Sequence, residues 1–508
     1  MKNQERLDHL LKVFVKSSVI LLFGIILSKI LTYAYRIVIA RNFGQETYGL
    51  FSLALMIATL FVTVFSLGLQ SGLLRYISLY RGKEENEKIK SILTFSSNLT
   101  LIVSLLAAGL LFFLSKTIAI NIFHNPNLII YLQGFAIFLP IFIFSGFFHV
   151  ITLSYEKVGW YSFIGNILSP LVQLLFLIIF IFMGLKEESI IFSYNLGFLA
   201  ILLSAFLVCN YGIKKIFEKS LLKKEEKNDL NKKLFSYSWP IMFLGLTMSL
   251  FSWIDSFLIG YFKTASDVGI YNVAFLLASF LLVVPALFLQ IFLPIITKEY
   301  SNNNFGLIKD LSKQIAKWIF ILNLPLLIIM ILFPGAIINL LFGSNYILAE
   351  NSLRFLSIGV FVYSILQISE NLLSMIGKSK RILFNLVVAT IFNTLLNFIL
   401  IPNYGINGAA FSTMISYILW GILSLFTAKH FTNILPLRWD MVKIILISLI
   451  PTLILLYFRS KISLTTGNII ILGIFFLVSY FGIMVLTKCF DKNDLMIIQT
   501  IKNKISKK

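Results

Sequence analysis

Long apolar stretches are the feature that most constrains this chain. A helix of about 20 mostly apolar residues crosses the hydrocarbon core of a bilayer. The sequence offers fourteen such stretches, at 14–36, 48–69, 91–114, 129–153, 161–183, 189–211, 235–260, 270–296, 315–334, 353–374, 382–401, 406–428, 442–458 and 467–487. They are too long and too uniformly apolar for barrel strands, and a helix satisfies its own backbone in lipid. The sequence therefore predicts an all-α integral membrane protein with about fourteen transmembrane helices.

Composition supports this fold class and excludes others. Only 13% of the residues are charged, against about 25% in soluble domains. The net charge of +21 is concentrated in short loops, where Lys and Arg meet anionic lipid, so no nucleic-acid partner is expected. The two cysteines, Cys209 and Cys489, and the four scattered histidines have no metal-ligand spacing. We therefore expect no metal and no cofactor.

The loop charges predict the orientation. If the N-terminus is cytoplasmic, 34 of the 43 Lys and Arg residues fall on the inner side and 7 in outer loops. This asymmetry predicts fourteen crossings of the cell membrane with both termini in the cytoplasm. No small-residue cleavage pattern follows the first apolar stretch, so we expect that stretch to be retained as a spanning helix.

An internal repeat relates two parts of the chain. The motif YGLFSLA at 48–54 returns as VGIYNVA at 268–274, so that Gly49 matches Gly269 at an offset of 220 residues. The offset spans six predicted helices. Because six is even, the two copies would share one orientation, as in parallel transporter repeats.

The repeat aligns two polar helix faces. Lys29, Thr32, Tyr33 and Arg36 lie at positions i, i+3, i+4 and i+7 of the first span, and the offset relates them to Ser249, Ser252, Trp253 and Ser256. The two faces would meet across a shared central cavity, or they would form polar seams between helices. A seam suits Lys29 badly, because a cation in the membrane costs about 2.5–3.5 kcal/mol even on insertion scales.

Two acidic residues lie within apolar stretches. Asp255, in SLFSWIDSFLIGY, aligns with Tyr35 through the repeat. It is a candidate for ion coupling, and the alternative is a structural salt bridge to a cation of the first helix. Glu370, in SILQISENLLSMIGK, is expected to make a polar contact between helices.

Five sequence blocks carry a family resemblance. They are ARNFGQETYGLFSLA (40–54), GLQSGLLRYISLYRGK (68–83), DSFLIGYFKTASDVGIYNVA (255–274), LFGSNYILAENSLRFLSIG (341–359) and PNYGINGAAFSTMISY (402–417). In this order they resemble the polysaccharide flippases, the Wzx-type O-antigen members of the multidrug/oligosaccharidyl-lipid/polysaccharide exporter superfamily. The resemblance implies two pseudo-symmetric six-helix lobes, at 1–212 and 213–430, followed by two C-terminal helices and a tail in 431–508. This is the architecture of the multidrug exporters and murein-precursor flippases of that superfamily.

The resemblance also implies a function. The chain would move a polyprenyl-(pyro)phosphate-linked oligosaccharide across the cytoplasmic membrane by alternating access, for surface polysaccharide or glycan synthesis. Its partners would be this substrate, membrane lipids and glycan polymerases or glycosyltransferases. The phosphate of the carrier would meet Lys29 and Arg36, supported by Arg75 and Arg41. Tyr33 and Trp253 would stack on sugar or pack against the carrier tail.

Three alternatives stay open at this point. A murein-precursor (lipid II) flippase is the nearest one. A multidrug or cation antiporter of the same fold would need an acidic cavity, and few acids lie in the spans. A membrane glycosyltransferase or ligase would need long outer loops with clustered acids or histidines, and neither is present in the sequence. We therefore expect a transporter and not an enzyme.

Overall fold

The structure is helical throughout the residues it describes. The computed structural model describes residues 2–212, 220–461, 466–487 and 489, and within them no strand occurs. Eleven helices in these ranges are long and apolar enough to cross a membrane. The prediction of an all-α integral membrane protein is therefore confirmed.

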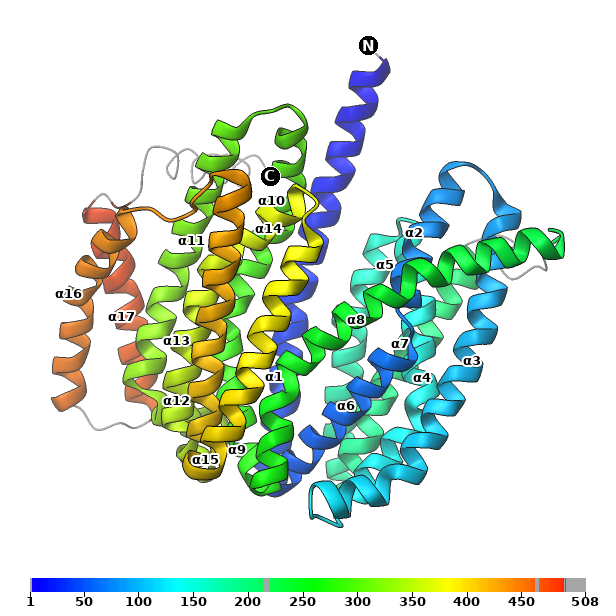
Figure 1. Cartoon of the computed structure of the whole chain (residues 1–508). Helices are drawn as coiled ribbons and strands as arrows, with labels where there is room; N and C mark the ends of the chain where they lie inside the picture. The colour runs from blue at the N-terminus through cyan, green and yellow to red at the C-terminus, as the bar shows by residue number, and fades with distance from the viewer. Residues whose placement is uncertain (1, 213–219, 462–465, 488, 490–508) are drawn as a thin grey trace. The chain divides into compact units, whose positions relative to one another are not determined.

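The helices follow one another along the chain as Figure 1 shows. The first are α1 (Lys2–Phe65), α2 (Leu69–Gly82), α3 (Asn86–Thr117), α4 (Leu128–Ser154), α5 (Val158–Ser162), α6 (Ser169–Phe182), α7 (Glu188–Gly212), α8 (Lys224–Phe262) and α9 (Ala265–Ala278). The others are α10 (Val283–Ser301), α11 (Phe305–Leu332), α12 (Pro334–Phe342), α13 (Glu350–Leu366), α14 (Ile368–Met375), α15 (Ser379–Thr432), α16 (Asp440–Lys461) and α17 (Thr466–Leu486). Short π or 3₁₀ turns continue several of them, as between α5 and α6.

Two of the eleven long helices are kinked at a glycine, and each of these two contains two of the fourteen expected spans. Helix α1 contains the first two expected spans, which meet at Gly44, where φ is 83°. Helix α15 contains the eleventh and twelfth, which meet at Gly405, where φ is 55°. Glycine adopts such left-handed values without steric cost. The shorter apolar helix Ile471–Leu486 is the last expected span, so each of the fourteen stretches has a helical counterpart.

Contacts between loops agree with the predicted alternation of sides. Loops expected outside are joined to one another by the pairs Asn125–Glu46, Thr47–Glu187 and Lys263–Pro402. Loops expected inside are joined by Arg81–Glu156, Ser220–Glu87 and Arg438–Gln314. A missing or extra crossing would have placed some of these partners on opposite sides of the membrane.

The described residues pack into two compact units. One lies within residues 1–276 and 386–413, and the other within 277–385 and 414–508. The division of the chain into lobes at 1–212 and 213–430 with a separate 431–508 stays a prediction.

Helix α2 is an element that the span count did not include. The segment 70–90 was expected to be a loop, but residues Leu69–Gly82 form a helix. The reason is a stripe of apolar residues at helical spacing: Leu69, Leu73, Ile77 and Tyr80 are all buried. The helix has fourteen residues, too few to cross a bilayer.

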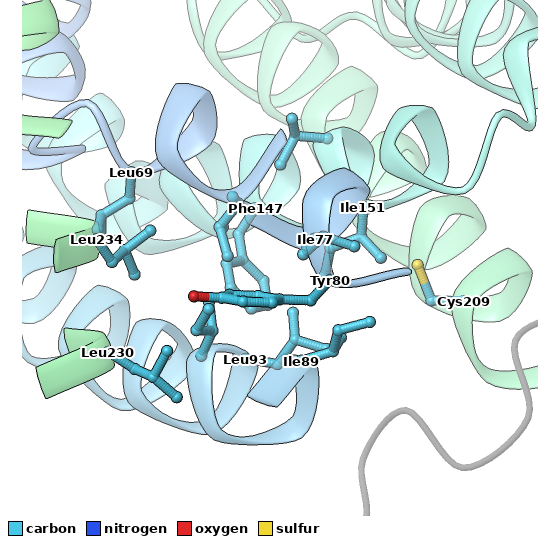
Figure 2. Packing of buried hydrophobic residues seen from close by; sticks show 13 residues of the cluster. Leu69, Ile77, Tyr80, Ile89, Leu93, Phe147, Ile151, Cys209, Leu230 and Leu234 are labelled. Carbon is cyan, nitrogen blue, oxygen red and sulfur yellow. The ribbon is translucent and has the colours of Figure 1, made fainter. Parts of the chain in front are cut away.

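A buried cluster fixes α2 against three longer helices. Its apolar stripe packs with Ile89 and Leu93 of α3, Phe147 and Ile151 of α4, and Leu230 and Leu234 of α8. Figure 2 shows these side chains gathered around the ring of Tyr80. These close-packed side chains hold the first half of α8 to α2 by van der Waals contact.

The two glycines of the repeat touch each other. A Cβ on Gly49 would lie 1.7 Å from the carbonyl oxygen of Ala265, and a Cβ on Gly269 would lie 2.2 Å from that of Gln45. The offset of 220 relates Gln45 to Ala265, so both copies make the same contact. Ser266 also donates a hydrogen bond to Gln45 (2.8 Å). Helices α1 and α9 therefore cross backbone to backbone, and only glycine leaves room for the crossing.

We expect Gly49→Ala and Gly269→Ala to lower stability by about 1–3 kcal/mol each, because an added methyl group must push the helices apart. The measurement is thermal unfolding of the purified chain in detergent. Gly109→Ala is the matched control, since no atom lies within 4 Å of a Cβ at that helical position. Equal melting temperatures for Gly49→Ala and Gly109→Ala would contradict the close crossing.

Candidate functional site

A cationic face runs along the first arm of α1, the part of the helix that precedes the kink at Gly44. Lys29 is exposed and Arg36 is half-buried, both within the apolar stretch Phe23–Phe65. The two charges act on each other electrostatically. The Arg36 guanidinium donates a hydrogen bond to the Tyr48 hydroxyl (3.5 Å) and also interacts with Tyr33 and Tyr194. The structure thus places Lys29, Tyr33 and Arg36 together, as the helical spacing predicted.

The neighbouring face of α1 is anchored to α7. Tyr35 is buried, and its hydroxyl donates to the carbonyl of Ile190 (3.1 Å) and lies 3.1 Å from Ser193 Oγ. Its ring packs on Phe51 and Tyr194 with centroid distances of 6.2 and 6.0 Å. Because Tyr35 fixes the rotation of the helix, Arg36 is held in one direction.

Within the described residues, neither cation is neutralised. Among the described residues, no carboxylate forms an ion pair with Lys29 or Arg36. Elsewhere in the chain basic residues do form ion pairs, as Arg354 does with Glu350 at an N–O distance of 3.5 Å. Two unpaired cations seven residues apart on one helix within an apolar span form a site suited to an anion.

The other predicted binding residues lie apart from this pair. Arg41 is exposed near the kink of α1, and Trp253 is half-buried on α8. Arg75, on α2, lines a pocket formed with α8, and neither Lys29 nor Arg36 is among the residues of that pocket. The role of Arg75 beside Lys29 and Arg36 stays a prediction.

Asp255 lies at the centre of a buried polar network. Its carboxylate accepts hydrogen bonds from the Tyr271 hydroxyl (2.5 Å), the Thr413 hydroxyl (2.5 Å) and the Asn397 amide (2.6 Å). Asn393 supports the network by donating to Thr413 (3.0 Å). These groups come from α8, α9 and α15, and all are buried. The network lies within one compact unit.

The alternative reading of Asp255, a structural salt bridge, is wrong. No Lys or Arg among the described residues contacts Asp255, and its partners are hydroxyls and an amide. Asn397 presents its amide nitrogen to the carboxylate, while its Oδ1 is buried without a hydrogen-bond partner. A buried carboxylate whose partners are all neutral can take up a proton or a small cation.

The sequence contained a signal for this network that was missed. Asn393 and Asn397 lie four residues apart in the apolar stretch NTLLN, on one face of α15. Amides embedded in a span rarely lack a polar partner. Their pairing with Asp255 crosses 142 residues of chain, which no local pattern could indicate.

Glu370 makes the expected contact between helices. Its carboxylate accepts hydrogen bonds from the Tyr363 hydroxyl (3.3 Å) and from Ser424 of α15 (3.5 Å). The predicted interhelical polar contact is therefore confirmed.

Comparison with known proteins extends these observations. The profile of the family described as "Polysaccharide biosynthesis protein" matches residues 14–300, and the profile described as "MatE" matches residues 240–399. An uncharacterized membrane protein of Methanocaldococcus jannaschii, MJ1068, is 26% identical over 90% of this chain and 91% of its own. A protein of Shigella flexneri named "Putative O-antigen transporter" is 24% identical over 80% of this chain and 96% of its own.

The fold matches a solved structure. The lipid II flippase MurJ in its inward closed conformation superimposes with a TM-score of 0.73, covering 94% of this chain and all of that chain at 16% identity. At this identity the match shows the fold, and it confirms the expected architecture.

We expect Thr413→Val to lower stability by about 1–3 kcal/mol, because it removes one of the two hydrogen bonds to Asp255 Oδ2 and the hydroxyl that accepts from the buried Asn393 amide. Thermal unfolding in detergent measures the loss. Thr394→Val is the matched control on the same helix, since the Thr394 hydroxyl only bonds the backbone of its own helix, at Thr390. If both variants unfolded at the same temperature, the network would not be a stabilising unit.

Proposed function

The chain belongs to the polysaccharide biosynthesis protein family, and we propose that it moves a polyprenyl-(pyro)phosphate-linked oligosaccharide across the cell membrane. The coarser description is established: it is a multi-pass membrane protein and a flippase of the multidrug/oligosaccharidyl-lipid/polysaccharide exporter superfamily. Transport, and no catalysed reaction, is the proposed activity.

One observation carries the proposal. Lys29 and Arg36 are cations within an apolar span that no carboxylate neutralises among the described residues. Such charges are costly in lipid, and a ligand phosphate offsets that cost. Arg36 offers a planar fork of donors and Lys29 a mobile point charge, and both suit phosphate oxygens. A drug cation would be repelled by the same pair.

The substrate has three parts that need different surroundings. Its polyprenyl tail remains in lipid, its phosphate meets the cations, and its sugar head needs polar or aromatic surface. Tyr33 lies one turn from both cations and serves as the proposed sugar or tail contact. Trp253 takes the equivalent place in the second repeat, and Arg41 supports the phosphate from the end of the arm. Alternating access then moves the head across.

Asp255 is the proposed coupling residue. Its network binds a proton or a small cation in the neutral surroundings described above, and a change of charge there alters hydrogen bonds of α8, α9 and α15 together. A ligand can shift a conformational equilibrium only through such differential contacts.

The proposed orientation places both termini in the cytoplasm, as the loop charges predict. The proposed partners are the enzymes that build and use the lipid-linked glycan, glycosyltransferases and polymerases. A second candidate substrate is lipid II, because the fold matches a lipid II flippase at a TM-score of 0.73. Both substrates carry phosphate on a polyprenyl chain, so the sugar head distinguishes them.

We expect Lys29→Ala to lower the rate of flipping by about ten- to a hundredfold, the equivalent of one lost charge-assisted bond. The assay uses the full chain in liposomes with a fluorescent oligosaccharide on polyprenyl pyrophosphate, and dithionite quenching reports the outer leaflet. Lys29→Arg should retain more activity than Lys29→Gln, since charge matters most here.

Lys116→Ala is the matched control for this experiment, because Lys116 is an exposed lysine at the end of α3. Wild-type flipping by Lys29→Ala at equal protein density would refute the phosphate site. Faster flipping of lipid II than of the oligosaccharide carrier would assign the murein precursor as substrate.

We expect Asp255→Asn to abolish the stimulation of flipping by an imposed ion gradient, since the amide cannot change its charge. Initial rates are compared with a sodium gradient, a proton gradient and neither. Thr413→Ser, which keeps the hydroxyl partner, is the control and should respond as the wild type does. Full stimulation of Asp255→Asn would remove Asp255 from coupling.

A further inference from the structure

A second cationic pocket lies between α2 and α8. It has a volume of about 530 Å³ and is lined by Arg75, Tyr76, Asp229, Lys232, Lys233, Ser236 and Tyr237. The residues from α8 recur at intervals of three and four, so they form one face of that helix. The buried residues Leu230, Leu234 and Ser238 lie on another face.

Two tyrosines hold Arg75 in place. Its guanidinium lies 4.3 Å from the centre of the Tyr237 ring and 5.8 Å from that of Tyr76. The two rings meet edge to face at 6.0 Å, and the Tyr76 hydroxyl donates to the carbonyl of Lys233 (3.3 Å). A guanidinium stacked on a ring keeps its N–H groups, which lie in its own plane, free to donate at the edge.

The charge of the pocket is not balanced. Asp229 pairs with Lys233 at 2.5 Å. Arg75 and Lys232 have no acidic partner among the described residues. Three cations and one carboxylate therefore line the pocket, and the carboxylate is already paired with Lys233. The α2–α8 packing shown in Figure 2 fixes the two helices that carry them.

The pocket lies where α8 changes from charged to apolar. Residues 223–233 carry most of the charges of α8, whereas from Leu234 onward the helix is mostly apolar. Phe235 and Trp239 follow at once and are 42% and 46% exposed. Exposed aromatic residues beside basic ones are typical of the boundary between membrane and water. A ligand here would have an anionic head beside Arg75 and an apolar body along Phe235 and Trp239.

We propose that this pocket binds the phosphate of an anionic phospholipid from the surrounding membrane. Basic pockets between helices at the membrane surface recognise such headgroups. The phosphodiester would accept hydrogen bonds from Arg75 and Lys232, and the acyl chains would cover the exposed aromatic side chains. The site is distinct from Lys29 and Arg36, and the proposal does not depend on the identity of the transported glycan.

The test uses the full chain in detergent micelles and the anisotropy of fluorescent phosphatidylglycerol. The double variant Arg75→Gln/Lys232→Gln should bind about 25-fold more weakly than wild type, since each basic residue near the surface contributes about fivefold. Lys116→Gln/Lys186→Gln removes two exposed cations elsewhere and should change the affinity less than twofold. Lys232→Gln alone should weaken lipid binding about fivefold. Because Lys232 is exposed, this variant should fold normally, so its lower affinity reports lost binding and not misfolding.

Several outcomes would overturn the proposal. An equal loss of lipid affinity in the two double variants would show that the net charge of the protein alone attracts the lipid. Unchanged binding by Lys232→Gln and by the Arg75 double variant would exclude the pocket. Displacement of the lipid by inorganic phosphate at equal concentration would identify a free-phosphate site. Displacement by stoichiometric polyprenyl-pyrophosphate oligosaccharide would assign the pocket to the transported carrier. Phosphatidylcholine, which has no net charge, should not displace the fluorescent phosphatidylglycerol. Displacement by it would show that the pocket does not select an anionic headgroup.

Discussion

The crossing of α1 and α9 at Gly49 and Gly269 constrains everything around it. The two backbones approach so closely that a methyl group on either glycine would overlap a carbonyl oxygen of the other helix. Close contacts of this kind are a main source of helix association in lipid, where the hydrophobic effect between helices is absent. The crossing fixes where the second arm of α1 lies and where α9 begins. Asp255 and Tyr271, which flank the start of α9, are placed by it.

Charge within the spans is arranged in two contrasting ways. Asp255 is enclosed by hydroxyl and amide donors, so its charge is satisfied by neutral groups of the protein. In the part of the chain that the structure describes, Lys29 and Arg36 have no acidic partner, which is the basis for proposing an anionic ligand there. A carboxylate beside the two cations would have satisfied both at once, and the chain would then have had no anion site and no isolated titratable group. Because the opposite charges lie apart, the two proposed binding sites have separate chemistries.

Much of the fold could be predicted from the sequence, because long apolar stretches and loop charges depend on local composition. The fourteen stretches, the repeat at 220 residues and the shared face of Lys29, Tyr33 and Arg36 are of this kind. Helix α2 was missed because its apolar stripe is too short to resemble a span. The partners of Asp255 and the contacts of Arg75 with α8 could not be predicted because they depend on contacts between distant segments. Periodicity can place a residue on a face, but it cannot identify the helix that packs against that face.

The kinks at Gly44 and Gly405 have a practical consequence for work with the intact protein. Proteases and inserted tags need an exposed loop that can be drawn out as extended chain. At these two turns a single glycine joins two spanning arms, and no such loop exists. Cleavage sites or epitope tags placed there would disrupt the helices they were meant to report on. Connections such as 124–127 and 184–187, which leave the helices intact, are the places where the chain can be cut or labelled without losing the membrane arrangement.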